Sequence, residues 1–246
     1  MRLVLLHGIG SRWQLWRPVL PALEARFDVI ALDFPGFGAA APGGGSDVRA
    51  LADWVQDRVG GPCHVAGSSM GGGVALELGR RGFARSVTAF SPIGFWGPLS
   101  RRWCQVSVTG ARVLAQVFRP ALPVLSGTKA GRVALYGLFF GHPTRVDPAE
   151  GVADAAALAK APGFAAARAA FAHHRFEGTL PDIPVTIAWG TRDAILPAYQ
   201  SRRARRLLPS ARHEKLPGCG HLPFADDPAR CADLITETAT PRAAGT

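Results

Sequence analysis

The segment 67–71, Gly-Ser-Ser-Met-Gly, holds a serine where it could act as a nucleophile. It follows an apolar run at 62–66, which predicts a buried strand, and precedes a run at 72–81 whose apolar spacing predicts a packed helix. A sharp turn from a strand into a helix lifts one side chain above the sheet, and small residues let the two elements approach closely. We expect Ser69 to occupy the exposed apex of that turn.

A serine nucleophile needs a base to take its proton, and the base needs an acid to orient it. His221 is the best placed histidine, because a Gly-rich loop carries it just after a predicted strand at 212–216. Asp193 stands just after a predicted strand at 185–189. The carboxyl ends of parallel strands meet at one edge of a sheet, so we expect Ser69, Asp193 and His221 to form a catalytic triad in that chain order.

The remaining histidines and acids have simpler explanations. His173 and His174 could touch a substrate, but a surface pair is the better explanation. Asp226 and Asp227 follow the candidate base and are expected to cap the last helix. Packing or an uninformative turn position is expected for His64, His142 and His213.

An oxyanion hole is predicted from the Gly-rich segment 7–10, which directly follows the first predicted strand. Such a turn can aim backbone N–H groups at a developing negative charge, and each donor is typically worth ~3 kcal/mol in the transition state. We assign the two donors to the N–H groups of Ile9 and Met70. His7 is then expected to brace the turn and not to act as a base.

Strand-like and helix-like runs alternate along most of the chain, which predicts an α/β fold with a mostly parallel sheet flanked by helices. Strands are expected at 2–6, 27–33, 62–66, 86–90, 185–189 and 212–216. Helices are expected at 13–26, 47–59, 72–81, 198–208 and 228–238. The tail at 241–246 is expected to be disordered.

The alternation stops between residues 92 and 181, where Gly and Pro separate helix-like runs at 100–118, 133–140 and 148–172. This stretch is too long for a connection, so a helical cap at 92–181 is expected on a core of 1–91 and 182–246. Some of its large apolar residues should line a pocket against the sheet edge. The candidates are Phe95, Trp96, Trp103, Phe118, Leu138, Phe139 and Phe140.

The chain of 246 residues carries a net charge of +10, almost all of its cations being arginine. The charge could serve an anionic partner, namely an acidic carrier protein, a nucleic acid or a membrane surface, or it could reflect an Arg-rich composition alone. The densest cluster, at 202–206, lies on a predicted surface helix without interleaved aromatics, so nucleic acid is not expected as a partner.

Composition also limits the compartment and the cofactors. No apolar run reaches 18 residues, so no membrane span is expected. The first apolar run stops at residue 7 without a cleavage site, which favours a core strand and a cytoplasmic protein over a signal peptide. The four cysteines are widely spaced, so neither a metal site nor a structural disulfide is expected.

Four motifs together resemble the α/β-hydrolase superfamily, within its class of serine hydrolases with a helical cap. They are Leu-Leu-His-Gly-Ile-Gly at 5–10, Asp-Phe-Pro-Gly-Phe-Gly at 33–38, Gly-Ser-Ser-Met-Gly-Gly at 67–72, and the pair 189–193 and 218–221. Their spacing is similar to that of carboxylesterases that demethylate pimeloyl-carrier-protein esters, and to actinobacterial hydrolases of unassigned substrate. Family members usually begin with two further strands, so the resemblance implies a shorter sheet of about six strands.

The resemblance implies hydrolysis of a carboxylic ester or thioester through an acyl-enzyme, with no cofactor. The substrate would be a small acyl ester, either free or carried on an acidic carrier protein. A serine at the turn argues against haloalkane dehalogenases and epoxide hydrolases, which in this superfamily use a carboxylate there. A C–C bond hydrolase, a cofactor-free perhydrolase, a lyase or a non-hydrolytic ligand-binding member remain alternatives on the same fold.

Overall fold

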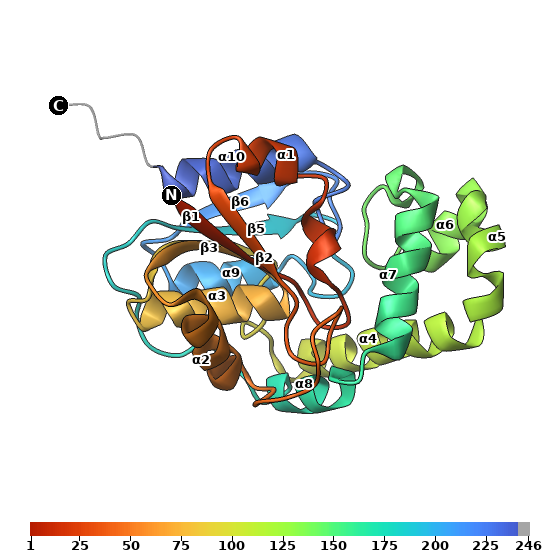
Figure 1. Cartoon of the computed structure of the whole chain (residues 1–246), viewed down its shortest axis with the longest axis horizontal. Helices are drawn as coiled ribbons and strands as arrows, with labels where there is room; N and C mark the ends of the chain where they lie inside the picture. The colour runs from red at the N-terminus through yellow and green to blue at the C-terminus, as the bar shows by residue number, and fades with distance from the viewer. Residues whose placement is uncertain (241–246) are drawn as a thin grey trace.

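One sheet of six strands forms the centre of the computed structural model, which describes residues 1–240 (Figure 1). The strands are β1 Arg2–Leu6, β2 Asp28–Leu32, β3 Cys63–Ser68, β4 Ala84–Phe90, β5 Val185–Gly190 and β6 Arg212–Leu216. Their order is β2-β1-β3-β4-β5-β6, and every neighbouring pair is parallel. The expected parallel sheet of about six strands is therefore confirmed.

Helices cover both faces of this sheet (Figure 1). One face carries α1 Leu20–Glu24 and α10 Pro228–Ala239, and the other carries α2 Val48–Val59, α3 Met70–Arg80 and α9 Gln200–Leu207. Because successive side chains of a strand point to opposite faces, Leu3 and Leu5 of β1 join one core while Val4 and Leu6 join the other. Burial on both faces explains why the inner strands are mostly apolar, whereas the edge strand β6 is largely polar and partly exposed.

The predicted helix at 13–26 is wrong. The chain forms a short 3-10 turn at Trp13–Trp16 and then the brief helix α1. Pro18 lies between the two elements and lacks a backbone N–H, so a continuous helix would lose a hydrogen bond there. Pro21 falls in the first turn of α1, where that loss costs nothing.

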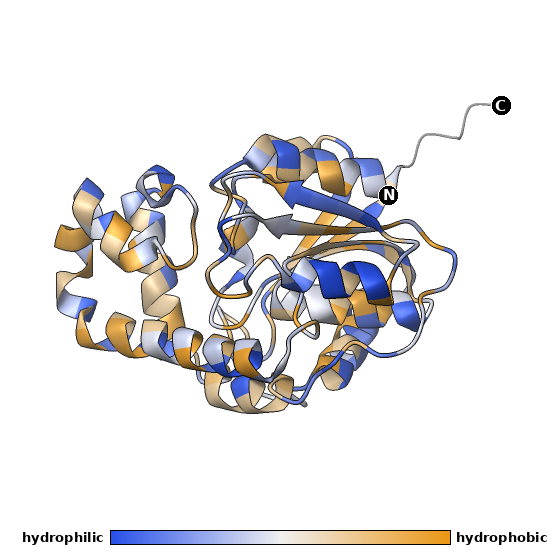
Figure 2. Cartoon of the chain, turned by 180° about the vertical axis from the view of Figure 1, so that it is seen from behind, coloured by the Kyte–Doolittle hydropathy of each residue, from blue (hydrophilic) through white to orange (hydrophobic). Residues whose placement is uncertain are grey.

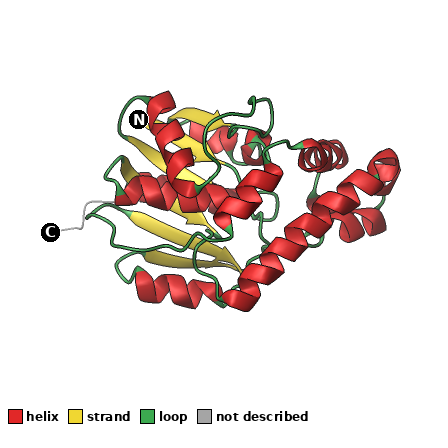
Figure 3. Cartoon of the chain, turned by 90° about the horizontal axis from the view of Figure 1, so that it is seen from below, coloured by secondary structure: helices red, strands yellow, loops and turns green. Residues whose placement is uncertain are grey.

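The segment 92–181, called the helical segment below, contains no strand within the described residues. Its helices are α4 Pro98–Val117, α5 Leu122–Gly127, α6 Lys129–Tyr136, α7 Pro148–Lys160 and α8 Phe164–Phe171, with short 3-10 turns at Arg119–Ala121 and Pro143–Arg145. Figure 1 shows α4 to α7 beyond the carboxyl ends of the strands, and Figure 3 shows the long α4 crossing the underside of the molecule. Its role as a separate cap stays a prediction.

Two expected helices of this segment differ from the structure. The helix expected at 148–172 is divided into α7 and α8, because Pro162 and Gly163 interrupt it. The helix expected at 133–140 begins four residues earlier and ends at Tyr136, since the Thr128 hydroxyl accepts a hydrogen bond from the Gly131 N–H and caps α6. The tail at 241–246 lies outside the described residues.

Candidate active site

Ser69 occupies the turn between β3 and α3, as expected, but the expectation that it would be exposed is wrong, since only 5% of its surface is exposed. Its backbone has φ 54° and ψ −112°, a conformation that costs a non-glycine residue free energy and that the surrounding structure must hold. The Ser69 N–H donates to the Phe90 carbonyl oxygen at 2.9 Å, and the Ile93 N–H donates to the Ser69 carbonyl oxygen at 3.1 Å. The end of β4 and the following loop therefore fix the turn.

Two glycines make this turn possible. A Cβ on Gly67 would lie 2.1 Å from the Gly71 carbonyl oxygen, and a Cβ on Gly71 would lie 2.2 Å from the Leu6 carbonyl oxygen. Both distances are far inside van der Waals contact, and the obstructing atoms are backbone. Helix α3 can therefore start directly above the ends of β1 and β3 only with glycine at both positions.

The predicted oxyanion loop lies against the candidate nucleophile. A Cβ on Gly8 would be 3.1 Å from the Ser69 Cβ and 3.7 Å from its Oγ. Ile9, the next residue, lines the large cavity described below. Met70 is the first residue of α3, so its N–H has no acceptor within that helix and is free for an anion. The fold thus brings both predicted donors to the surroundings of Ser69.

His7 holds the oxyanion loop and stays neutral. Its Nε2 accepts the Phe34 N–H at 3.0 Å, so its Nδ1 carries the proton and donates to the Gly8 carbonyl oxygen at 2.7 Å. Burial lowers the pKa of His7, against the opposing effects of the Gly8 carbonyl and the Asp33 carboxylate. This arrangement matches the bracing role expected for His7.

Asp193 and His221 are in direct contact at the same sheet edge. The His221 Nδ1 and the Asp193 Oδ2 are 2.8 Å apart, and both side chains are buried. The other carboxylate oxygen, Oδ1, accepts the N–H groups of Ile195 and Leu196 at 2.9 and 2.8 Å. The acid is therefore fixed on one side by backbone donors and faces the histidine with the other, as an orienting acid must.

A second aspartate positions the loop that carries His221. Asp226 Oδ2 accepts the N–H groups of Gly220 and Gly141, each at 2.8 Å, and its Oδ1 accepts the His142 N–H at 2.7 Å. Asp226 was expected to cap the last helix, but only Asp227 does so, through the Arg230 N–H. The sequence did not distinguish the two neighbours, because the difference lies in contacts with a distant segment.

The histidines outside the candidate triad mostly have structural roles. His64 Nδ1 lies 2.8 Å from the Ser86 hydroxyl, and His213 Nε2 lies 2.8 Å from the Leu208 carbonyl oxygen. His174 lines a separate polar cavity beside Gly73 of α3 and Glu77. These positions fit the packing roles expected for His64 and His213.

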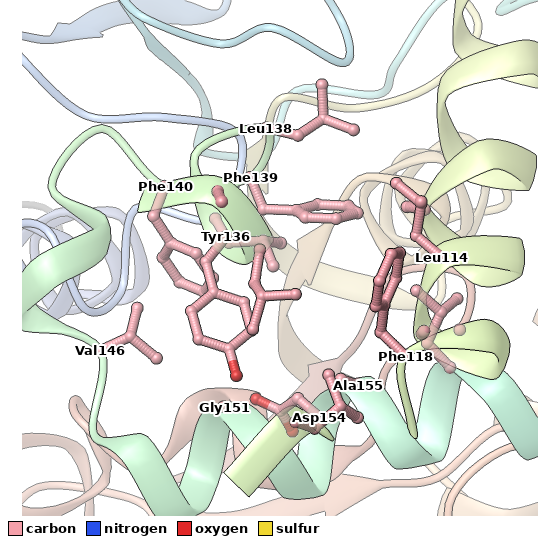
Figure 4. Close-up of a pocket in the computed structure, with 18 of the residues that line it drawn as sticks. Leu114, Phe118, Tyr136, Leu138, Phe139, Phe140, Val146, Gly151, Asp154 and Ala155 are labelled. Carbon is pink, nitrogen blue, oxygen red and sulfur yellow. The ribbon is translucent and has the colours of Figure 1, made fainter. Parts of the chain in front are cut away.

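A mostly apolar cavity of about 310 Å³ lies between the oxyanion loop and helices α4 to α7 (Figure 4). Of the aromatic and aliphatic residues expected in a pocket, Phe118, Leu138, Phe139 and Phe140 line it, whereas Phe95, Trp96 and Trp103 do not. Figure 4 shows the Tyr136 hydroxyl and the Asp154 carboxylate together on one side of this cavity.

Among the described residues that line the cavity, Asp154 is the acidic one. Its Oδ1 accepts the Nε–H of Arg12 at 2.8 Å, and Arg12 also binds Glu150 at 2.8 Å. Burial raises the pKa of Asp154, and the nearby Arg12 partly offsets that rise. These ion pairs join the 3-10 region after β1 to α7, so they connect the sheet to the helical segment.

Other kinds of site find no support within residues 1–240. No group of three or more His, Cys, Asp or Glu side chains is arranged to hold a metal ion. All four cysteines are free and buried. No helix in the described part of the chain combines the length and apolar character needed to cross a bilayer.

Comparison with known proteins identifies the family of the chain. Residues 3–234 match the model of the alpha/beta hydrolase family. The chain belongs to that family. Among its relatives, this hydrolase is 29% identical to a pimeloyl-[acyl-carrier protein] methyl ester esterase of Aromatoleum aromaticum, over 96% of each chain. It is 32% identical to epoxide hydrolase EphH of Mycobacterium tuberculosis, over 76% of this chain and 92% of that one.

A solved structure shares the fold of this hydrolase. The thermophilic esterase from Thermogutta terrifontis superposes with a TM-score of 0.71 at 24% identity, over 98% of this chain and 91% of that one. At this level of identity the likeness establishes the architecture, while the chemistry must come from the site.

Proposed function

We propose that this alpha/beta hydrolase cleaves a carboxylic ester or thioester through an acyl-enzyme on Ser69. The observation that carries the proposal is the strained turn at Ser69, which places a hydroxyl beside the oxyanion loop. The Asp193–His221 pair at the same edge of the sheet supplies an oriented base.

The reaction would follow the two steps of serine hydrolases. The Ser69 Oγ attacks the carbonyl carbon while Nε2 of His221 takes its proton, and the Ile9 and Met70 N–H groups bind the oxyanion. The C–O or C–S bond then breaks, and His221 returns the proton to the leaving alcohol or thiol. A water molecule releases the acid in the same way and regenerates Ser69. Asp193 holds the Nδ1–H throughout and stabilises the imidazolium.

The cavity supports an apolar acyl group, with the helical segment acting as its cap. Its walls are mostly aliphatic and aromatic, and its lining includes no lysine or arginine. A free carboxylate at the far end of the acyl chain would meet the partly buried Asp154 carboxyl group and be disfavoured. An ester or thioester with an uncharged chain fits best, either as a free molecule or on an acidic carrier in the cytoplasm.

Epoxide hydrolysis is less well supported, although one relative bears that name. The superfamily's epoxide hydrolases use a carboxylate at the turn, and this chain has Ser69 there with another serine before it. A serine can form an acyl-enzyme but does not replace a carboxylate in opening an epoxide.

A panel of p-nitrophenyl esters and matching thioesters of increasing acyl length tests the proposal. We expect activity that rises from acetyl to medium-length acyl groups and then falls as the cavity fills. Ser69→Ala should abolish it. Ser68→Ala is the matched control, since the buried Ser68 hydroxyl has no partner within residues 1–240 and its loss should be tolerated. Full activity in Ser69→Ala would refute the proposal.

A further inference from the structure

Helix α4 presents a row of large apolar side chains to solvent. Leu99, Val106 and Val117 have 84%, 59% and 65% of their surface exposed. Trp103 and Val113 lie in the same row and are about half exposed. The spacings of four, three, seven and four residues place all five on one side of the helix, over a length of roughly 27 Å. Exposed apolar surface of this extent indicates an interaction site.

This apolar row is continuous with the cavity. Leu114 and Phe118 of the same helical stretch are about half exposed, and both also line the cavity beside the oxyanion loop. The rim of the cavity and the exposed row are therefore parts of one apolar surface. An apolar phase in contact with α4 would also contact the way into the cavity.

The stretch of chain that carries the row has charge of one sign. Residues 92–146, which include α4, α5 and α6, contain seven cations and no Asp or Glu. The cations are Arg101, Arg102, Arg112, Arg119, Lys129, Arg132 and Arg145. Residues 194–211 likewise contain four arginines, all on α9, and no acid. Both stretches therefore attract anions.

Helix α9 lies beside the beginning of α4. The Arg203 guanidinium of α9 donates to the Trp96 carbonyl oxygen at 3.0 Å, just before α4. The Trp103 indole of α4 donates to the Ala194 carbonyl oxygen at 2.7 Å, in the loop between β5 and α9. Figure 2 shows the hydrophilic α9 and the apolar turns of α4 on the same side of the molecule. The exposed Tyr199 stands at the start of α9.

We propose that α4 and α9 form a docking face for an anionic lipid surface. A helix that combines an apolar side with neighbouring cations lies in the plane of a bilayer interface, with tryptophan and tyrosine at headgroup level. An acidic protein would complement the positive charge, but only an apolar phase would bury the whole apolar row from Leu99 to Val117. The face would also bring the cavity rim to the acyl chains. The docking itself does not depend on ester hydrolysis.

Co-sedimentation of the full chain with vesicles tests this proposal. The protein should bind phosphatidylcholine vesicles that contain phosphatidylglycerol, and binding to phosphatidylcholine alone should be at least about tenfold weaker. The triple variant L99N/V106N/V117N keeps the net charge and should lose binding by about tenfold or more. R202Q/R205Q/R206Q should lose on the order of 100-fold, since each of the three cations near such a surface contributes roughly fivefold.

A charge-matched control is R26Q/R58Q/R85Q, which removes three exposed arginines from other elements and should keep binding. Turnover of a short, water-soluble ester should be unchanged in all three variants if they are folded, as circular dichroism would check. Failure of the wild type to bind the anionic vesicles would overturn the proposal. Undiminished vesicle binding by the asparagine variant would also overturn it and would assign the face to an acidic protein. A wild-type dimer in light scattering that becomes a monomer in the asparagine variant would overturn it as well.

Discussion

The carboxyl edge of the sheet and the helical segment are built in different ways. At the edge, backbone atoms decide the structure: Gly67 and Gly71 admit no side chain, and Asp193 and Asp226 bind backbone N–H groups. In the helical segment, side chains form the cavity and much of the surface, and apolar residues remain exposed. The turn that carries the proposed nucleophile therefore rests on backbone geometry, whereas the cavity rests on side-chain packing.

The largest effect should follow loss of the base. His221→Ala should lower kcat on the order of 10⁴-fold or more while the protein stays folded, because the parts of a triad act as a unit. His173→Ala is the control, since that side chain is exposed and should not affect turnover. Steady-state kinetics on one p-nitrophenyl ester would measure both. Comparable kcat values for the two variants would remove His221 from the mechanism.

A pair of glycine substitutions compares the two regions directly. Gly71→Ala should lower both activity and stability severely, because its Cβ would lie 2.2 Å from the Leu6 carbonyl oxygen. Gly110→Ala in α4 has nothing within 4 Å and should keep activity while stabilising the helix by up to about 1 kcal/mol. Thermal unfolding and kcat/KM of both variants check this. Equal tolerance at the two sites would contradict the distinction between the regions.

Substitution of Asp226 and Asp227, the two aspartates after His221, should reduce stability by smaller and unequal amounts. Asp226→Asn should cost roughly 1–3 kcal/mol of stability, because one amide oxygen cannot accept the three N–H groups that the carboxylate binds. It should also lower kcat, since the His221 loop loses a support. Asp227→Asn should cost little, because asparagine caps helices well. Urea unfolding of both variants tests this difference. Equal, small losses of stability would mean that Asp226 only caps the last helix, like Asp227, and does not position the His221 loop.

Mild acid should have the smallest effect. Burial lowers the pKa of His7 below its ordinary value of 6.5, so below that pH the unfolded chain binds a proton that the folded chain does not. The free energy of unfolding should therefore be fully present above about pH 6.5 and fall as the pH is lowered toward the folded pKa. Desolvation also lowers the pKa of His64, His174 and His213, so these side chains act in the same direction. Urea unfolding of His7→Gln should show a shallower decline, and an unchanged slope would contradict the account.

The sequence predicted the sheet well where strands are buried, since β1, β3, β4 and β5 consist mostly of buried residues. The edge strand β6 is polar and mostly not buried, and its place came from the alternation of elements. The bounds of β1 and β6 agree with the expected ranges to the residue. Helices were harder: α3 begins at Met70 and not at Gly72, since the glycines that weaken a helix are the ones that permit its close packing. The prediction of a helix at 13–26 did not take account of Pro18, which lies between the 3-10 turn and α1.

For the candidate active site, the residue types and their order along the chain were sufficient to select candidate catalytic residues. Ser69, Asp193 and His221 were chosen because each follows a strand, and the parallel sheet puts them at one edge. Asp226 could not be assigned, because its partners lie some eighty residues away in the chain and only the fold brings them together. The lining of the cavity was predicted only in part, because its residues also come from segments that are distant in the chain.

Covalent labelling tests the central claim most directly, namely that Ser69 is an activated nucleophile. A fluorophosphonate should modify the wild-type protein once, and peptide mass mapping should place the adduct on Ser69. The adjacent Ser68 is a built-in comparison, because it shares the segment but is fully buried. Labelling should vanish in Ser69→Ala, persist in Ser68→Ala and be strongly slowed in His221→Ala. An adduct on Ser68 or elsewhere, or no adduct on the folded wild type, would contradict the account.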